Sequence, residues 1–267
     1  MNRFALSILT AFALVITSSS ARAITLDWDA VTWTAGSYNG AFDIDPSNPG
    51  NDISVAVTAN GGATFQPEVV SPFPMTPARN QSFQGGLAAT ENTLCFALNL
   101  ASNAQSVTVT VSLSSLYTAG VNNVSFKIFD IDFVNGDGSA YQDQLSSIRG
   151  LSIDGTTLIA PTIITSLNNS LSGSGINQVV TGTAATSDLG AGSGDGNVTI
   201  SFGTNAIQSF TFTYGSGPLF ADPTFQHVGL YDLSFTPVPE IDPALLSIVS
   251  CLTAAGLVLH HRAKARK

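Results

Sequence analysis

The sequence predicts an all-β fold: an antiparallel β-sandwich or jelly roll of about eleven short strands. Apolar and polar residues alternate along most of the central part of the chain, and successive side chains of a strand point to opposite faces. Clusters of Gly, Pro, Asn and Asp interrupt these runs, as is typical of turns. No run shows the period of an amphipathic helix. Short strands with one apolar face bury that face by packing two sheets together.

The clearest expected strand is residues 106–113, in which aliphatic side chains alternate with Ser and Thr. Residues 198–202 and 210–214 repeat this pattern with Ile and with aromatic residues. The other expected strands, in chain order, are 26–33, 52–58, 93–98, 124–131, 145–153, 157–164, 178–183 and 228–235. Two segments rich in Pro or Gly, 65–86 and 187–196, are expected to be long loops.

The part of the chain that carries these strands is strongly acidic. Residues 24–236 contain sixteen acidic and three basic residues, which gives a net charge of −13. Such a surface repels nucleic acid and anionic lipid, and it attracts divalent cations. We therefore expect no nucleic-acid partner and a domain that is soluble outside the cell.

Residues 24–236 are poor in the side chains that catalysis most often uses. Cys95 is their only cysteine and His227 their only histidine. Cys95 lies among apolar residues and is expected to be a small buried hydrophobe. A single histidine excludes a zinc site with two His ligands, and no nucleophile elbow is present. Four aromatic residues could stack on sugar rings: Trp28, Trp33, Tyr38 and Tyr141. For Trp28 and Trp33, packing in or against the core is the stronger expectation. We expect a non-catalytic domain.

A run of carboxylates between residues 129 and 143 is the strongest candidate binding site. Its oxygen-bearing residues are Asp130, Asp132, Asn135, Asp137 and Asp143. Calcium takes six to eight oxygen ligands, and carboxylates clustered on a turn supply them. The alternative is turn chemistry, because Asn-Gly and Asp-Gly pairs favour tight hairpins without any metal. Both interpretations stay open, and Ca²⁺ is the only cofactor that the sequence suggests.

The first 23 residues have the pattern of a secretory signal peptide. A basic residue, Arg3, precedes an apolar stretch, and the small residues around Ala21 and Ala23 form a cleavage pattern that ends at Ala23. A retained N-terminal anchor is the alternative. The expectation is export through the inner membrane, with signal peptidase as a processing partner.

The C-terminal region has three parts in a fixed order. A short motif, Val238, Pro239, Glu240, Ile241, Asp242 and Pro243, precedes an uncharged apolar segment, 244–259, and a basic tail, 260–267. The apolar segment would span about 24 Å as a helix, slightly less than the hydrocarbon core of a bilayer. The tail carries four of the nine Lys and Arg residues, so it is expected to stay in the cytoplasm. An ordinary membrane helix at the end of the chain is the alternative.

This arrangement resembles the PEP-CTERM signal of exosortase substrates in Gram-negative bacteria. Ile241 stands where the common motif has its second proline. The resemblance implies transient membrane insertion by a single apolar helix and cutting by an exosortase near Pro239 and Glu240. It divides the chain into a signal peptide (1–23), a β-sandwich ectodomain (24–236) and a sorting signal (237–267).

Four segments of the ectodomain are similar to β-sandwich ectodomains of bacterial surface proteins. They are residues 129–132, 195–199, 213–218 and 226–235. The resemblance implies a non-catalytic, adhesin-like protein of the cell surface or extracellular matrix, with exopolysaccharide or other surface molecules as partners. The alternative function is a polysaccharide-binding or polysaccharide-degrading module of the same shape.

Overall fold

The computed structural model describes residues 22–69, 72–81, 83–88, 90–136, 139–185 and 194–239. Residues Arg22–Val238 form one compact unit. Most of the expected signal peptide, the sorting motif beyond Pro239, the apolar segment 244–259 and the basic tail lie outside the described residues. Within the described ranges, no helix has the length and apolar character needed to cross a membrane.

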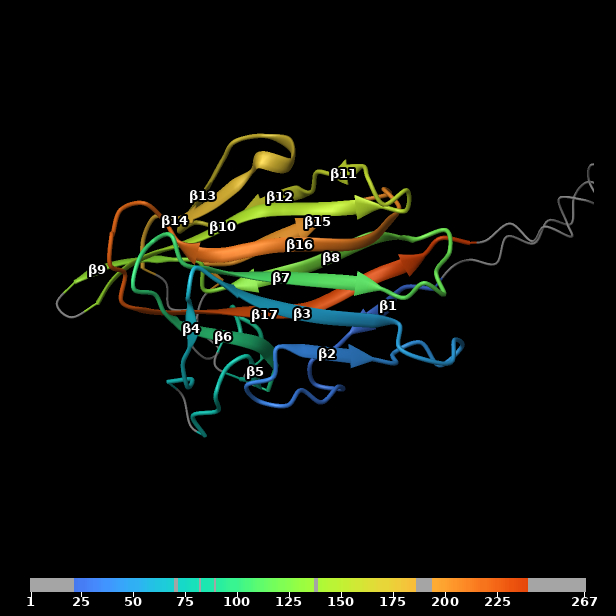
Figure 1. Cartoon of the computed structure of the whole chain (residues 1–267), viewed down its shortest axis with the longest axis horizontal. Helices are drawn as coiled ribbons and strands as arrows, with labels where there is room; N and C mark the ends of the chain where they lie inside the picture. The colour runs from blue at the N-terminus through green and yellow to red at the C-terminus, as the bar shows by residue number, and fades with distance from the viewer. Residues whose placement is uncertain are drawn as a thin grey trace, which may run out of the picture. The chain divides into compact units, whose positions relative to one another are not determined.

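Two antiparallel layers make up the fold (Figure 1). The first sheet has the order β2 (Asn39–Phe42), β3 (Ile53–Asn60), β7 (Ser106–Leu113), β16 (Ile207–Ser216), β10 (Ser139–Ser152), β14 (Val179–Gly182) and β13 (Asn169–Ser172). The second has the order β5 (Ala78–Asn80), β6 (Thr93–Asn99), β17 (Phe225–Pro237), β8 (Val121–Phe129), β15 (Val198–Ser201) and β12 (Thr162–Thr165). The expected sandwich of antiparallel strands is therefore observed.

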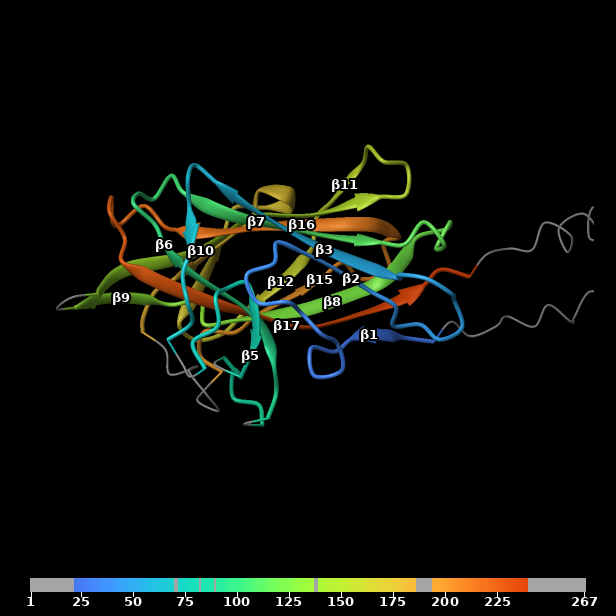
Figure 2. The ribbon, with the colours of Figure 1, turned by 60° about the horizontal axis from the view of Figure 1, so that its bottom comes forward.

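Four short strands and one turn complete the architecture. β1 (Ile24–Leu26) pairs with β17, and β4 (Thr64–Phe65) pairs with β6. β9 (Phe133–Gly136) and β11 (Leu158–Ile159) both pair with β10, and η2 (Gly175–Asn177) is a 3-10 turn. The pair Ile207↔Val121 joins β16 to β8, so the two layers belong to one curled sheet, which Figure 2 shows from the side.

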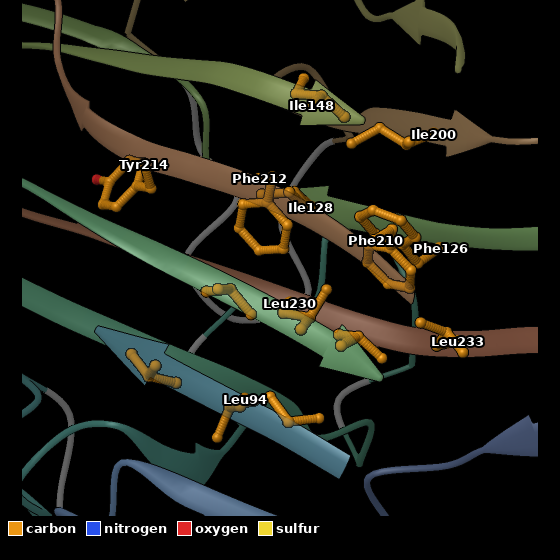
Figure 3. Packing of buried hydrophobic residues seen from close by; sticks show 14 of the residues in the cluster. Leu94, Phe126, Ile128, Ile148, Ile200, Phe210, Phe212, Tyr214, Leu230 and Leu233 are labelled. Carbon is orange, nitrogen blue, oxygen red and sulfur yellow. The ribbon is translucent and has the colours of Figure 1, made fainter. Parts of the chain in front are cut away.

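Side chains from both sheets fill the space between the layers (Figure 3). Phe210 of β16 stacks on Phe126 of β8 with ring centroids 4.6 Å apart, and Phe212 lies 5.9 Å from the same ring. The alternation along β7 and along residues 210–214 of β16 buries every second side chain and leaves the Ser and Thr residues between them facing outward. The periodicity that predicted these strands therefore also predicts their buried faces.

The strand number predicted from the sequence was too low, since seventeen strands are present among the described residues. β4, β5 and β11 contain two or three residues, which is too short for an alternating pattern to appear. The expected strand 26–33 is wrong beyond Leu26, because Asp27 starts a turn: its carbonyl accepts the N–H groups of Ala30 and Val31. The expected strand 145–153 is the second part of the longer β10.

Two packing predictions are confirmed, and the expected loop 65–86 is observed in part. Trp28 and Trp33 are buried and contact each other edge to face, with ring centroids 6.2 Å apart. Cys95 is buried and packs with Phe83 and Phe129 on the outer side of the second sheet. Part of the expected loop 65–86 covers that side, although β5 and the bridge Pro67↔Met75 lie within it.

Candidate functional site

The structure brings together three of the five residues predicted as calcium ligands. Asp130 and Asp132 directly follow β8, Asp143 lies on β10, and all three are buried. The Asp132 N–H group donates to Asp143 Oδ2 (3.2 Å), and the Asp143 N–H group donates to the Asp132 carbonyl (2.8 Å). Asn135 is different, because it is exposed in the β9–β10 hairpin opposite Ala140. Asp137 lies outside the described residues.

Four further polar residues belong to this carboxylate cluster, which we define by Asp130, Asp132 and Asp143. The Tyr214 hydroxyl donates to Asp143 Oδ1 (2.7 Å), and His227 Nε2 lies 3.2 Å from Asp130 Oδ2. The other two are Glu68, a buried residue whose charge acts on His227, and Tyr141, a partly buried residue that hydrogen-bonds to Asp132.

Two of these four residues carried a usable signal in the sequence. Tyr141 is two positions before Asp143 on one strand, so the two share a face. Tyr214 is the last residue of the alternating aromatic segment 210–214, for which the sequence predicted that the aromatic side chains share one face. Glu68 comes from a proline-rich loop whose path the sequence does not specify.

Burial and mutual repulsion control protonation in the cluster. Burial, followed by the charges of Asp132 and Asp130, raises the pKa of Asp143 well above its usual value. For His227, burial lowers the pKa, but the hydrogen bond to Asp130 and the charges of Asp130, Glu68 and Asp132 outweigh it. The net direction for the pKa of His227 is upward. Asp143 and His227 therefore retain their protons at higher pH than isolated side chains of these types.

The cluster does not by itself define a metal centre. Among the described residues, no group of three or more His, Cys, Asp or Glu side chains is arranged to hold a metal ion. Calcium binding at Asp130, Asp132 and Asp143 stays a prediction. The turn interpretation concerns the hairpin that follows, in which β9 and β10 pair from Phe133↔Gln142 to Gly136↔Ser139. Asn135 and Gly136 are paired strand residues of β9, and residues 137 and 138 lie outside the described residues.

The outer face of the first sheet is a second candidate site. Its central strands β3, β7 and β16 contain no charged residue. The outward side chains, which we call the hydroxyl face, are Ser54, Ala56, Thr58, Asn60, Ser106, Thr108, Thr110, Ser112, Ser209, Thr211 and Thr213. In Figure 1 this face is turned to the viewer, and no described segment crosses it.

The strand register aligns these side chains in rows across the sheet. Thr58, Thr108 and Thr213 form one row, and Ser54, Ser112 and Ser209 form another. Thr108 Oγ1 and Thr213 Oγ1 are 3.1 Å apart, within hydrogen-bond distance. Rows of this kind repeat at about 4.8 Å between strands and about 6.7 Å along each strand. The result is a regular, uncharged array of hydroxyl groups on a protein with a net charge of −9.

Comparisons with known proteins are limited to distant structural likeness. No family model matches the chain, and no curated protein matches it. One similar solved structure is a family 11 carbohydrate-binding module from Clostridium thermocellum in complex with a β-1,3-1,4-mixed-linked tetrasaccharide. It is 12% identical, the match covers 70% of this chain and 91% of that one, and the TM-score is 0.29.

A second solved structure is the family 11 carbohydrate-binding module of a cellulosomal cellulase of the same organism. It is 11% identical, with 84% of this chain and 99% of that chain covered and a TM-score of 0.30.

Removing the Tyr214 hydroxyl is expected to destabilise the protein. Tyr214→Phe leaves the buried Asp143 carboxyl without its hydroxyl donor, which costs about 1–3 kcal/mol of unfolding free energy. Urea unfolding at pH 7 measures the difference. Tyr38→Phe is the matched control, because Tyr38 is half exposed, and its expected effect is near zero. Equal effects of the two substitutions would contradict a structural role for the Tyr214 hydroxyl.

Calcium is expected to stabilise the protein if Asp130, Asp132 and Asp143 bind it. A ligand that binds only the folded state raises the melting temperature. Gel-filtered protein is melted in EDTA and in millimolar Ca²⁺, and Asp132→Asn should reduce the difference. Identical melting temperatures for the wild type in the two buffers would remove the calcium interpretation.

Proposed function

We propose that this protein is a non-catalytic β-sandwich that binds polysaccharide at the cell surface or in the extracellular matrix. The observation that carries the proposal is the hydroxyl face: an uncovered, uncharged array of Ser and Thr on the first sheet of an acidic protein. The proposal combines two functions expected from the sequence: that of a surface protein, and the alternative function of a polysaccharide-binding module.

The chemistry of the hydroxyl face fits an extended sugar polymer. Ser and Thr hydroxyls both donate and accept hydrogen bonds, as sugar hydroxyls do. Water molecules bridge such groups at little cost in affinity, so a long ligand can be held by many weak contacts. The central strands β3, β7 and β16 carry no charged side chain, so a polymer that covers them removes no charge from water there. The exposed Arg149 of β10 lies beside Thr211 at the margin of the hydroxyl face.

The carboxylate cluster is poorly placed for hydrolysis of a polysaccharide. Hydrolysis of a glycosidic bond uses two carboxyl groups that flank the scissile bond. Asp130, Asp132 and Asp143 are buried, and their described partners are the protein's own groups, among them Tyr214 and His227. Their arrangement suits a structural role at the end of the sandwich better than contact with a polymer.

Export and sorting form the second part of the proposal. They rest on the motif Val238–Pro243 and on the pattern of the first 23 residues. Val238 directly follows β17, and its N–H group donates to the Gly120 carbonyl (3.0 Å). The motif therefore begins where the folded sheet ends, as a processing signal requires.

Charges placed on the hydroxyl face are expected to abolish polysaccharide binding. Thr110→Glu combined with Thr211→Glu puts two carboxylates in the middle of the array, which should weaken binding at least about tenfold. Depletion of the purified protein by insoluble cellulose, chitin and β-1,3-1,4-glucan measures it. Neutral polymers should bind better than alginate, because the protein is acidic.

The matched control carries the same charges on the second sheet. Thr25→Glu combined with Thr199→Glu adds two carboxylates outside the hydroxyl face and should bind like the wild type. Failure of the wild type to bind any polymer in the panel would overturn the proposal. Equal binding by the two double variants would show that the hydroxyl face is not the site.

Processing is expected to remove the C-terminal region in the native host. Mass spectrometry of the protein isolated from cells or matrix should give a C-terminus near Pro239 and an N-terminus at Ile24. An intact Lys267 terminus on the surface-exposed protein would contradict sorting by cleavage.

A further inference from the structure

One charged side chain lies at the margin of the otherwise uncharged hydroxyl face. The strands of the first sheet contain two charged residues, Asp143 and Arg149, and both are on β10. Asp143 is buried and belongs to the carboxylate cluster, whereas Arg149 is exposed. The guanidinium of Arg149 is therefore the single charged group that the strands of this sheet present to solvent.

A β-bulge in β10 turns Arg149 toward the hydroxyl face. The pairing of β10 with β16 gains one residue of β10 between Ser146 and Arg149. Within this bulge Ser147 has a φ of +52°, a left-handed conformation that residues other than glycine seldom adopt. Leu145 before the bulge and Ile148 after it both face the core. Because sides alternate along a strand, Arg149 would point into the core if the extra residue were absent.

The side chain of Arg149 does not hold the fold together. Among the described residues, its guanidinium takes part in no salt bridge and no hydrogen bond. Arg79 is different, because it donates to the carbonyls of Trp28, Asp29 and Val31. Residues 24–236 contain sixteen acidic and three basic residues, so carboxylate partners are plentiful. A guanidinium that pairs with none of the described carboxylates is available to a ligand.

The strand register places Arg149 at the end of one row of the hydroxyl face. This row consists of Ala56 on β3, Thr110 on β7, Thr211 on β16 and Arg149 on β10. The Thr211 hydroxyl donates to the Ser147 carbonyl (3.4 Å), which joins the face to the bulge. A polymer that lies across the strands along this row therefore meets the guanidinium.

We propose that Arg149 determines the specificity of the hydroxyl face by binding a carboxylate of an otherwise neutral polysaccharide, such as a uronic acid substituent. This inference rests on the proposed polysaccharide binding. The planar guanidinium of arginine binds a carboxylate through two parallel hydrogen bonds, a geometry that a sugar hydroxyl does not match. The Ser and Thr hydroxyls of the face then hold the neutral sugars on either side.

The acidity of the protein limits how many carboxylates the ligand can carry. One cation on the face meets one carboxylate, whereas a uronate on every sugar would bring further carboxylates against a protein of net charge −9. For the same reason a carboxylate with one charge suits this site better than a phosphate monoester with nearly two. The expected ligand therefore has acidic sugars that are separated by neutral ones, which agrees with weak binding of alginate.

Binding of matched polymers by the full chain tests the role of Arg149. The probes are cellulose and β-1,3-1,4-glucan, each native and with a small fraction of its C6 hydroxymethyl groups oxidised to carboxylate. The wild type should bind the oxidised form about twofold to fivefold more tightly, as expected for one exposed ion pair. Arg149→Gln should bind the two forms alike. In about 1 M NaCl the preference of the wild type should disappear, because salt screens exposed charges.

Lys127→Gln is the matched control, because it removes the same charge from β8, where Lys127 lies opposite Thr199 on the second sheet. It should keep the preference of the wild type, and thermal melting checks that both variants fold. Equal binding of the native and oxidised forms by the wild type would overturn the role of Arg149 and leave the proposed function intact. An undiminished preference of Arg149→Gln, or an equal loss in Lys127→Gln, would also overturn it. Binding of neither form of either polymer would count against the proposed function itself.

Discussion

The packing of β16 against β8 is the interaction on which the rest of the structure depends. Phe210 and Phe212 of β16 meet Phe126 of β8 in the space between the sheets, and Ile207 of β16 pairs with Val121 of β8 where the layers join. β16 also lies in the middle of the first sheet, between β7 and β10. Because alternate side chains of β16 must point inward, its Ser and Thr residues must point outward. The same constraint that forms the core therefore creates the hydroxyl face.

The carboxylate cluster lies at the edge of this core and shares a residue with it. Tyr214 continues the inward row of Phe210 and Phe212, and its hydroxyl reaches Asp143 instead of water. A tyrosine at this position packs its ring in the apolar core and donates its hydroxyl to the polar cluster. The buried Asp143 carboxyl therefore has a hydrogen-bond donor. Asp143 therefore depends on the core for its position, and the loops after β8 depend on Asp143 through the Asp132 N–H group.

Strands with a long alternating pattern could be predicted from the sequence, while short strands and side-chain partners could not. Residues 106–113 were predicted with their bounds as observed, because four aliphatic residues on one face leave no other stable arrangement. β4 and β11 were not predicted, because strands of two residues are too short to show an alternation of apolar and polar side chains. In the site, Asp130 and Asp132 were placed correctly together, but Asn135 is held in the exposed hairpin by its pairing with Ala140. His227 joins the cluster from β17, the neighbouring strand of β8, and Glu68 joins it from the loop between β4 and β5; no local pattern encodes either contact.

The position of β17 has a mechanical consequence. This thirteen-residue strand pairs with β6 and β1 on one side and with β8 on the other, and it runs directly into the C-terminal motif. A force applied at the C-terminal end acts along the axis of β17, so it loads many ladder hydrogen bonds at once instead of opening them one by one. The first strand, β1, is paired to the same end of β17 through Ile24↔Phe235. A protein held by its C-terminal end against flow or a moving polymer would thus transmit the load through a strand that is paired along both of its edges.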